Sequence, residues 1–270
     1  MHPRLRQAVR ILAVILLATL WGCAELSGPF QSAGSAEIGD NSGLRVVAGH
    51  FEIAGMFGTE TADAHLIGRE ITLGRERLGI AATQPDPQDP THAIALYRFV
   101  RLDTAHTSYC PGEGLGFPVA GRLAIGDAGG GGISIVCLGT AAARCVHLGY
   151  QPWRKAADGT SLADYTDACI RAVRADYCGS GNSHAGQSDA LALYDRLGIQ
   201  HLRAADGMSF EAGWGAYGAV CVNHTRAPAR MTLKDLRTEC ANLPRSRLGN
   251  SCDERNPALI FTKSPVTPSS

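Results

Sequence analysis

The fold is decided by two neighbouring stretches, Gly149-Tyr150-Gln151-Pro152-Trp153-Arg154 and Arg174-Ala175-Asp176-Tyr177-Cys178-Gly179. The first has the form of a turn marked by a proline and a tryptophan. The second ends in a glycine directly after a cysteine. Proline breaks regular structure, and glycine readily adopts the left-handed conformation that ends a helix. The two stretches therefore frame a predicted helix.

That helix is predicted over residues 162–178. Ser161 has the residue type of an N-cap, and Asp164 places an acidic group in the first turn. A second, shorter helix is predicted over residues 233–241, because Thr232 begins the same capping pattern. The apolar face of the first helix consists of Leu162, Tyr165, Cys169 and Val173. This spacing predicts that Cys169 faces the core and bonds to another element.

Most of the remaining chain has strand patterns. Short apolar segments between glycine-rich and proline-rich turns predict a small antiparallel β unit over residues 44–109. The glycine run at 129–132 is expected to be a hairpin tip, because no helix and no GK[ST] follows it as a phosphate loop would require. The other predicted strands are residues 119–125, 133–137, 145–150, 190–195, 208–214, 218–222 and 258–261.

These patterns predict an α+β fold that is β-rich, mostly antiparallel and stapled by disulfides, with the two short helices as its only helices. The chain divides into a lipoprotein signal peptide, a flexible tether, the N-terminal β unit, a cysteine-rich domain and a disordered tail. Their expected bounds are residues 1–23, 24–43, 44–109, 110–263 and 264–270.

The N-terminus has the composition of an export signal. Three arginines precede an uncharged apolar run that is too short to span a bilayer as a mature helix. The run ends in Leu20-Trp21-Gly22-Cys23, which resembles a bacterial lipobox, although an ordinary signal peptide cut nearby stays open. Acylation of Cys23, with palmitate among its chains, would give a membrane anchor. Ala24 in place of aspartate resembles lipoproteins sent to the outer membrane, on its periplasmic or surface face.

Eight cysteines remain after Cys23. An even number of cysteines in an exported chain predicts disulfides, although the sequence leaves their pairing open. No CxxC knuckle is present, so we expect neither a zinc site nor a cofactor. The eight are Cys110, Cys137, Cys145, Cys169, Cys178, Cys221, Cys240 and Cys252.

The charge of the chain is balanced, with 25 basic and 25 acidic residues. Nucleic-acid binding usually leaves a basic footprint, so we expect no nucleic-acid partner. The expected partners are the membrane, through the lipid anchor, and a polymer or protein of the cell envelope.

The segment from about Ile133 to Lys263 resembles the ADYC domain family, through Ala175-Asp176-Tyr177-Cys178 and several landmarks in order. The resemblance covers roughly half the chain and implies an exported, often lipid-anchored bacterial protein, without implying an activity. Ser180 departs from the family pattern, which has an acidic residue there. The other landmarks are Gly149–Trp153, Ser183-His184, Tyr194-Asp195, residues 210–214 and residues 218–222.

Three catalytic interpretations of the sequence compete with structural ones. Cys178 and His184 lie six residues apart, but a disulfide explains Cys178 better than a thiolate nucleophile does. No G-x-S-x-G or H-E-x-x-H motif is present. A hydrolase that uses Asp176 and His184, with or without a divalent ion, is the alternative to a binding function. The oxygen ligands of a calcium turn would be Asp176, Asn182, Asp189 and Asp195, but they lack EF-hand spacing.

Candidate binding residues are Trp153 and Trp214, which could form an aromatic platform, and Arg174. Tryptophans are more often core residues, and Asp176 more simply pairs with an arginine. The sequence therefore predicts a lipid-anchored envelope protein that acts as a non-catalytic binding or structural module.

Overall fold

The computed structural model describes residues 44–53, 65–121, 123, 132–186, 189–202 and 207–266. All of them belong to one compact unit, Ala36–Ser270. The predicted signal peptide with Cys23, the tether and most of the glycine run lie outside the described residues, and so does the end of the predicted tail.

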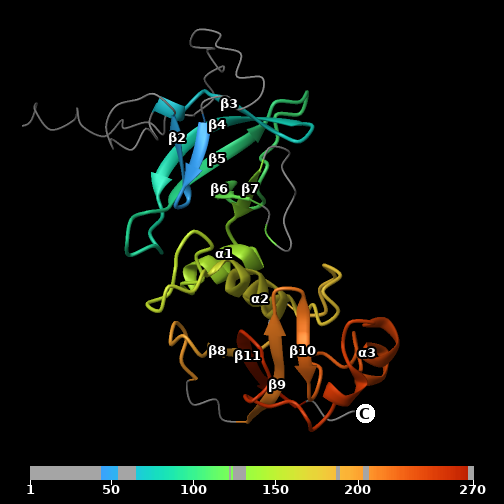
Figure 1. The fold of residues 1–270 in the computed structure, drawn as a ribbon. Helices are drawn as coiled ribbons and strands as arrows, with labels where there is room; N and C mark the ends of the chain where they lie inside the picture. The colour runs from blue at the N-terminus through green and yellow to red at the C-terminus, as the bar shows by residue number, and fades with distance from the viewer. Residues whose placement is uncertain are drawn as a thin grey trace, which may run out of the picture. The chain divides into compact units, whose positions relative to one another are not determined.

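A five-stranded sheet has the order β3-β4-β5-β6-β7, with antiparallel neighbours throughout (Figure 1). β6 and β7 lie beyond residue 110 and complete the sheet begun by β3, β4 and β5. The strands are β3 (Glu70–Leu73), β4 (Glu76–Pro85), β5 (Ala95–Arg101), β6 (Leu115–Ala120) and β7 (Ile133–Cys137).

A two-stranded hairpin, β1 (Leu44–Val47) and β2 (His50–Ile53), packs on this sheet. Phe51 is its anchor, because its ring meets Tyr97 and Phe99 edge-on at centroid distances of 5.2 and 6.4 Å. The Tyr97 hydroxyl also accepts a hydrogen bond from the Phe51 amide at 3.0 Å. One apolar cluster therefore holds the hairpin and the sheet together.

A second antiparallel sheet has the order β10-β9-β11-β8. Its central strands are β9 (Met208–Gly215) and β11 (Ile260–Pro265), and its edges are β8 (Ala192–Asp195) and β10 (Gly218–Val222). The predicted hairpin of residues 208–214 and 218–222 is confirmed as β9 and β10. The tail predicted from Ser264 starts too early, because β11 continues to Pro265 with Ser264 fully buried.

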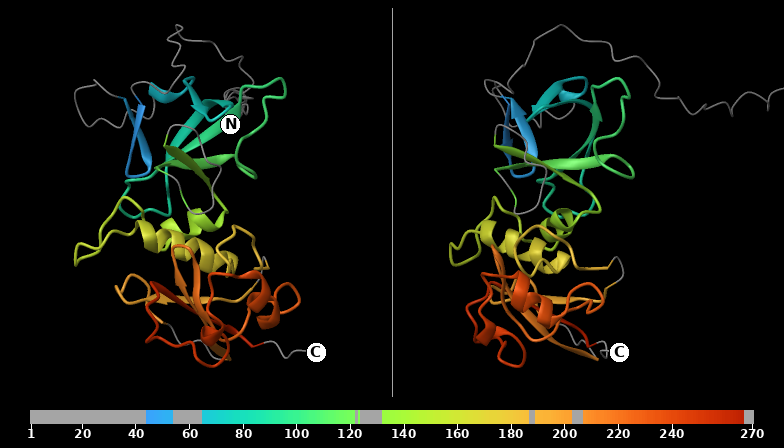
Figure 2. Two further views of the ribbon diagram at one scale, coloured as in Figure 1. Left: turned by 45° about the vertical axis from the view of Figure 1, so that its right-hand side comes forward. Right: turned by 90° about the vertical axis from the view of Figure 1, so that its right-hand side faces the viewer.

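Three helices occur in the described residues: α1 (Ala141–His147), α2 (Ala163–Arg174) and α3 (Leu233–Glu239). α1 packs on α2 and β7, and α2 packs on β9, β10 and β11, so the two helices contact both sheets (Figure 2). The largest apolar cluster surrounds these two helices and includes residues of both sheets.

Three local predictions are wrong. Residues 145–147 end α1 instead of beginning a strand, because a short apolar run cannot distinguish the two and Thr140 caps the helix by accepting from the Ala143 amide. Leu162 is the N-cap of α2, although the Ser161 hydroxyl does accept from the Ala163 amide. The same helix ends at Ala175, in the left-handed conformation, well before Gly179.

All eight cysteines of the predicted framework form disulfides, which confirms their structural use. The pairs are Cys110–Cys137, Cys145–Cys169, Cys178–Cys240 and Cys221–Cys252. The second pair joins α1 to α2, as expected for a core-facing Cys169. The predicted class, a β-rich and mostly antiparallel α+β fold with disulfide staples, is confirmed, with three helices instead of two.

Candidate functional site

Asp176 follows the left-handed residue that ends α2, and that reversal turns its side chain back onto the helix. Its Oδ2 atom accepts from Arg171 Nη1 at 2.5 Å and from the Gly181 amide at 3.0 Å. The carboxylate is completely buried. The expected arginine partner is Arg171, while Arg174 donates to the Gly181 carbonyl at 2.6 Å. Asp176 therefore belongs to the scaffold.

Tyr177 forms the next layer of the same scaffold. Its hydroxyl donates to Glu211 Oε1 at 2.8 Å and accepts from the Arg226 amide at 2.8 Å, while its ring stacks on Trp214 at 5.1 Å. Burial raises the pKa of Tyr177 well above its usual value, and the neighbouring Glu211 carboxylate adds to the shift. Arg226 Nη2 lies 3.0 Å from Glu211 Oε2, in a buried ion pair. Tyrosine, glutamate and arginine thus satisfy one another inside the core.

The remaining residues predicted for a thiol or aromatic site are also structural. Cys178 is bonded to Cys240, so the pairing of a Cys178 thiolate with His184 is wrong. Trp214 is completely buried and donates from Nε1 to Thr262 Oγ1 at 2.9 Å, so no platform with Trp153 forms on the surface. Trp153 is partly buried against the main core cluster. His184 is half-buried, and its amide donates to the Arg174 carbonyl.

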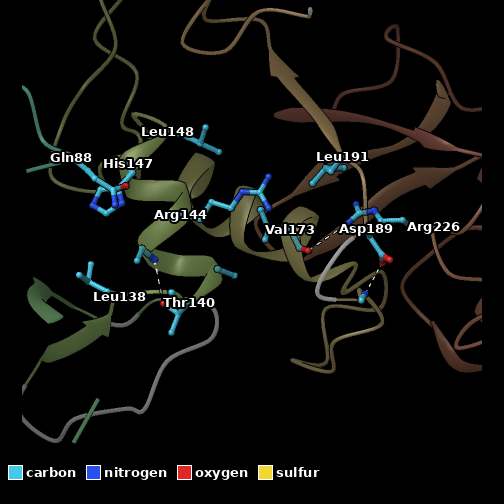
Figure 3. Close-up of a pocket in the computed structure, with 14 residues that line it drawn as sticks. Gln88, Leu138, Thr140, Arg144, His147, Leu148, Val173, Asp189, Leu191 and Arg226 are labelled. Atoms are coloured by element: carbon cyan, nitrogen blue, oxygen red, sulfur yellow. Dashed lines mark hydrogen bonds between the residues drawn. The ribbon is translucent and has the colours of Figure 1, made fainter. Parts of the chain in front are cut away.

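The structure instead shows a cavity of about 530 Å³ beside α1 (Figure 3). Its walls come from the loop after β4, from α1, from the end of α2 and from the segment before β8. The polar lining residues are Gln88, Thr140, Arg144, His147, Asp189 and Arg226, and the apolar ones include Leu138, Leu148, Val173 and Leu191. Cavities of this size are typical of small-molecule sites.

Arg144 is the cation that this cavity leaves available. It is exposed on α1, and within the described part of the chain its guanidinium makes no hydrogen bond or ion pair. In Figure 3 its side chain extends from α1 toward the side of the cavity that carries Val173 and Leu191. The neighbouring Cys145 is bonded to Cys169 of α2, which fixes the helix that presents Arg144. Arg226, by contrast, is already paired with Glu211.

His147, one turn after Arg144, is oriented by a buried carboxylate. Its Nε2 atom lies 2.7 Å from Asp86 Oδ2, and Asp86 is 1% exposed. The other oxygen of Asp86 accepts from the Gln88 amide at 2.9 Å. This contact attaches the proline-rich loop after β4 to the end of α1. It therefore sets the position of Gln88 on the rim of the cavity.

The sequence analysis missed Arg144, His147 and Asp86. The signal for the first two was the Thr140 cap followed by three alanines, which favours a helix with Arg144 and His147 on one face. No sequence signal connects Asp86 with a histidine 61 residues away.

Among the residues that the structure describes, no group of three His, Cys, Asp or Glu side chains is placed to hold a metal ion.

The proposed calcium turn is not assembled. Asp176 forms an ion pair with Arg171, and Asp195 accepts from the Tyr150 hydroxyl at 2.6 Å and from the amides of its own loop.

No helix in the described ranges is long and apolar enough to cross a membrane.

The model of the ADYC domain matches residues 59–228, which is more than half of the chain and includes every wall of the cavity. No curated protein and no solved structure matches the chain.

Proposed function

Because the chain belongs to the ADYC domain family, we propose that it is a non-catalytic binding module of the bacterial cell envelope whose α1 cavity binds an anionic group on Arg144. The observation that carries the proposal is the Arg144 guanidinium, which has no partner among the described residues and lines a cavity of about 530 Å³. A guanidinium makes two parallel hydrogen bonds to a carboxylate or phosphate, and these are among the stronger contacts that a ligand can gain.

The rigidity of the walls supports a binding role. The Cys145–Cys169 disulfide holds α1 against α2, and the Asp86–His147 contact holds the loop that carries Gln88. A site that is already ordered loses less conformational entropy when a ligand binds. Arg144 therefore lies on a helix that is already held in place before a ligand binds.

The potentially reactive side chains are already bonded or paired, which supports a non-catalytic role. The eight cysteines of the body are in disulfides, and Asp176 is buried in its ion pair with Arg171. Within the described part of the chain, no hydrogen bond or ion pair joins Asp176 to His184, and neither residue lines the cavity. They do not form the pair that the alternative hydrolase would use.

The location follows in part from the disulfides, which agree with an extracytoplasmic protein. We propose in addition that Cys23 is acylated and anchors the protein to the outer membrane, since the preceding residues resemble a lipobox. Cys23→Ser is expected to move the protein from the membrane fraction to the soluble fraction of the envelope. Retention of this variant in the membrane fraction would contradict the anchor.

Binding at Arg144 can be tested by NMR titration of the disulfide-bonded protein with small dicarboxylates, N-acetylated amino acids and inorganic phosphate. We expect shifts of the α1 amides, and an affinity about tenfold or more lower in Arg144→Gln. Arg154→Gln is the matched control, because Arg154 is exposed and does not line the cavity. Equal responses of the two variants would count against the proposed site.

A further inference from the structure

Besides Arg144 and Arg226, which is paired with Glu211, the carboxylate of Asp189 lines the same cavity. Asp189 accepts from the Gly186 amide through Oδ2 at 2.5 Å, and within the described ranges its Oδ1 atom makes no hydrogen bond. No ion pair joins Asp189 to Arg144, although both line the cavity. Figure 3 shows Asp189 beyond Val173 as seen from Arg144. One cavity thus holds a cation and an anion that do not neutralise each other.

This charge arrangement selects among anionic ligands. A ligand that carries only negative charge gains from Arg144 but is repelled by Asp189, whereas a ligand with both charges gains at each end. Leu148, Val173 and Leu191 line the cavity with apolar surface. The complementary ligand therefore has a negative end, a positive end and an apolar body.

Resting on the proposed function, we infer that the cavity binds a short peptide with free termini, its carboxylate on Arg144 and its ammonium group on Asp189. Two or three residues separate the termini by about 7–11 Å when extended. The cavity volume of about 530 Å³ suits a ligand of that class. Small apolar side chains would lie against Val173 and Leu191.

The test is calorimetric titration of the disulfide-bonded protein with Ala-Leu-Ala in three forms: free, N-acetylated and C-amidated. Asp189→Asn keeps an acceptor for the Gly186 amide but removes the charge. We expect this variant, and separately acetylation of the peptide, to weaken binding about tenfold or more. Acetylation is expected to have little further effect on the variant, because both changes remove the same contact. Asp164→Asn, exposed and away from the cavity, is the matched control.

The outcomes separate the two proposals. If amidation and Arg144→Gln weaken binding while acetylation and Asp189→Asn do not, the anion site stands and the peptide inference is overturned. If no peptide binds but N-acetylated amino acids or dicarboxylates bind in an Arg144-dependent way, the peptide inference is again overturned alone. If nothing binds through Arg144, both proposals fail. Peptides built from D residues, compared with L residues, distinguish a cell-wall source from a protein source.

Discussion

Arg171 and Asp176, five residues apart, form a buried ion pair with 2.5 Å between Nη1 and Oδ2. Arg171 also donates from Nε to the Ala216 carbonyl at 2.6 Å, so the pair joins the end of α2 to the turn between β9 and β10. Gly179 has a φ of +70° and lies so close to that turn that a Cβ atom there would clash with the Tyr217 carbonyl. The block from Ala175 to Gly179 is therefore where the helix and the second sheet are held together.

The ion pair leads to the first prediction. Asp176→Asn should lower the free energy of unfolding by about 3–5 kcal/mol, because it leaves the Arg171 charge buried without its counter-charge. Chemical denaturation measures the change, and Asp164→Asn on the exposed face of the same helix is the control. A free energy of unfolding within about 0.5 kcal/mol of the parent's would contradict a structural role of Asp176 and would favour a functional one.

The hydroxyl of Tyr177 allows a sharper test. Tyr177→Phe keeps the stacking on Trp214 but leaves Glu211 Oε1 without its tyrosine donor and the Arg226 amide without its acceptor. We expect a loss of about 1–3 kcal/mol in the free energy of unfolding. Tyr217→Phe is the matched control, because that side chain is 86% exposed and should lose almost nothing. Equal effects of the two substitutions would contradict the network.

His224 should make stability depend on pH. Burial of its imidazole lowers its pKa below the ordinary 6.5, and Arg226 adds to this, while Glu211 and hydrogen bonds at Ser264 and Phe210 oppose it. As the pH falls below about 6.5, the unfolded chain therefore binds a proton before the folded one does. The free energy of unfolding then decreases, until the pH reaches the lower pKa of the folded state.

His224→Gln is expected to reduce this decrease, because it removes the titrating group and keeps a polar partner for the Ser264 hydroxyl, now 3.0 Å from the histidine. Thermal unfolding at roughly pH 7.5 to 5 measures it. His201→Gln, at an exposed position, is the control. Parallel curves for the parent and His224→Gln would show that this histidine does not contribute.

The disulfide pairing is tested by peptide mapping under non-reducing conditions, with free thiols alkylated. We expect four cross-linked peptide pairs and no alkylation of the eight cysteines before reduction. The diagnostic pair is Cys178–Cys240, which closes a loop of 62 residues. A freely alkylated Cys178 would contradict this disulfide and would leave a free thiol six residues before His184 in the sequence.

Local sequence patterns were sufficient to predict those elements whose structure depends on residues close together in the chain. The capping sequences gave α2 and α3 within a few residues at their starts, and the glycine-separated apolar runs gave the β9–β10 hairpin. The even number of cysteines predicted disulfides without their pairing. The Cys145 segment was assigned wrongly, because a run of a few apolar residues fits a strand and a helix equally well.

The candidate site could not be predicted from these local patterns. An arginine partner was expected for Asp176, but which arginine it is depends on the left-handed Ala175, which turns the chain so that the carboxylate meets Arg171. The cavity is formed by the loop at Gln88, by α1 and by the segment at Asp189, which are far apart in the chain.

The β-rich class, the main helix and the use of the cysteines could be predicted from the residues alone, because periodicity, capping and composition act over short distances. The tertiary structure was needed to place Asp176 and Trp214 in the scaffold, and to show Arg144 at a cavity with no partner among the described residues. This is because burial and charge pairing depend on which distant segments meet. In this chain α2 packs on the second sheet, where Asp176 and Trp214 are buried, and the cavity lies where α1 meets the loop at Gln88 and the segment at Asp189.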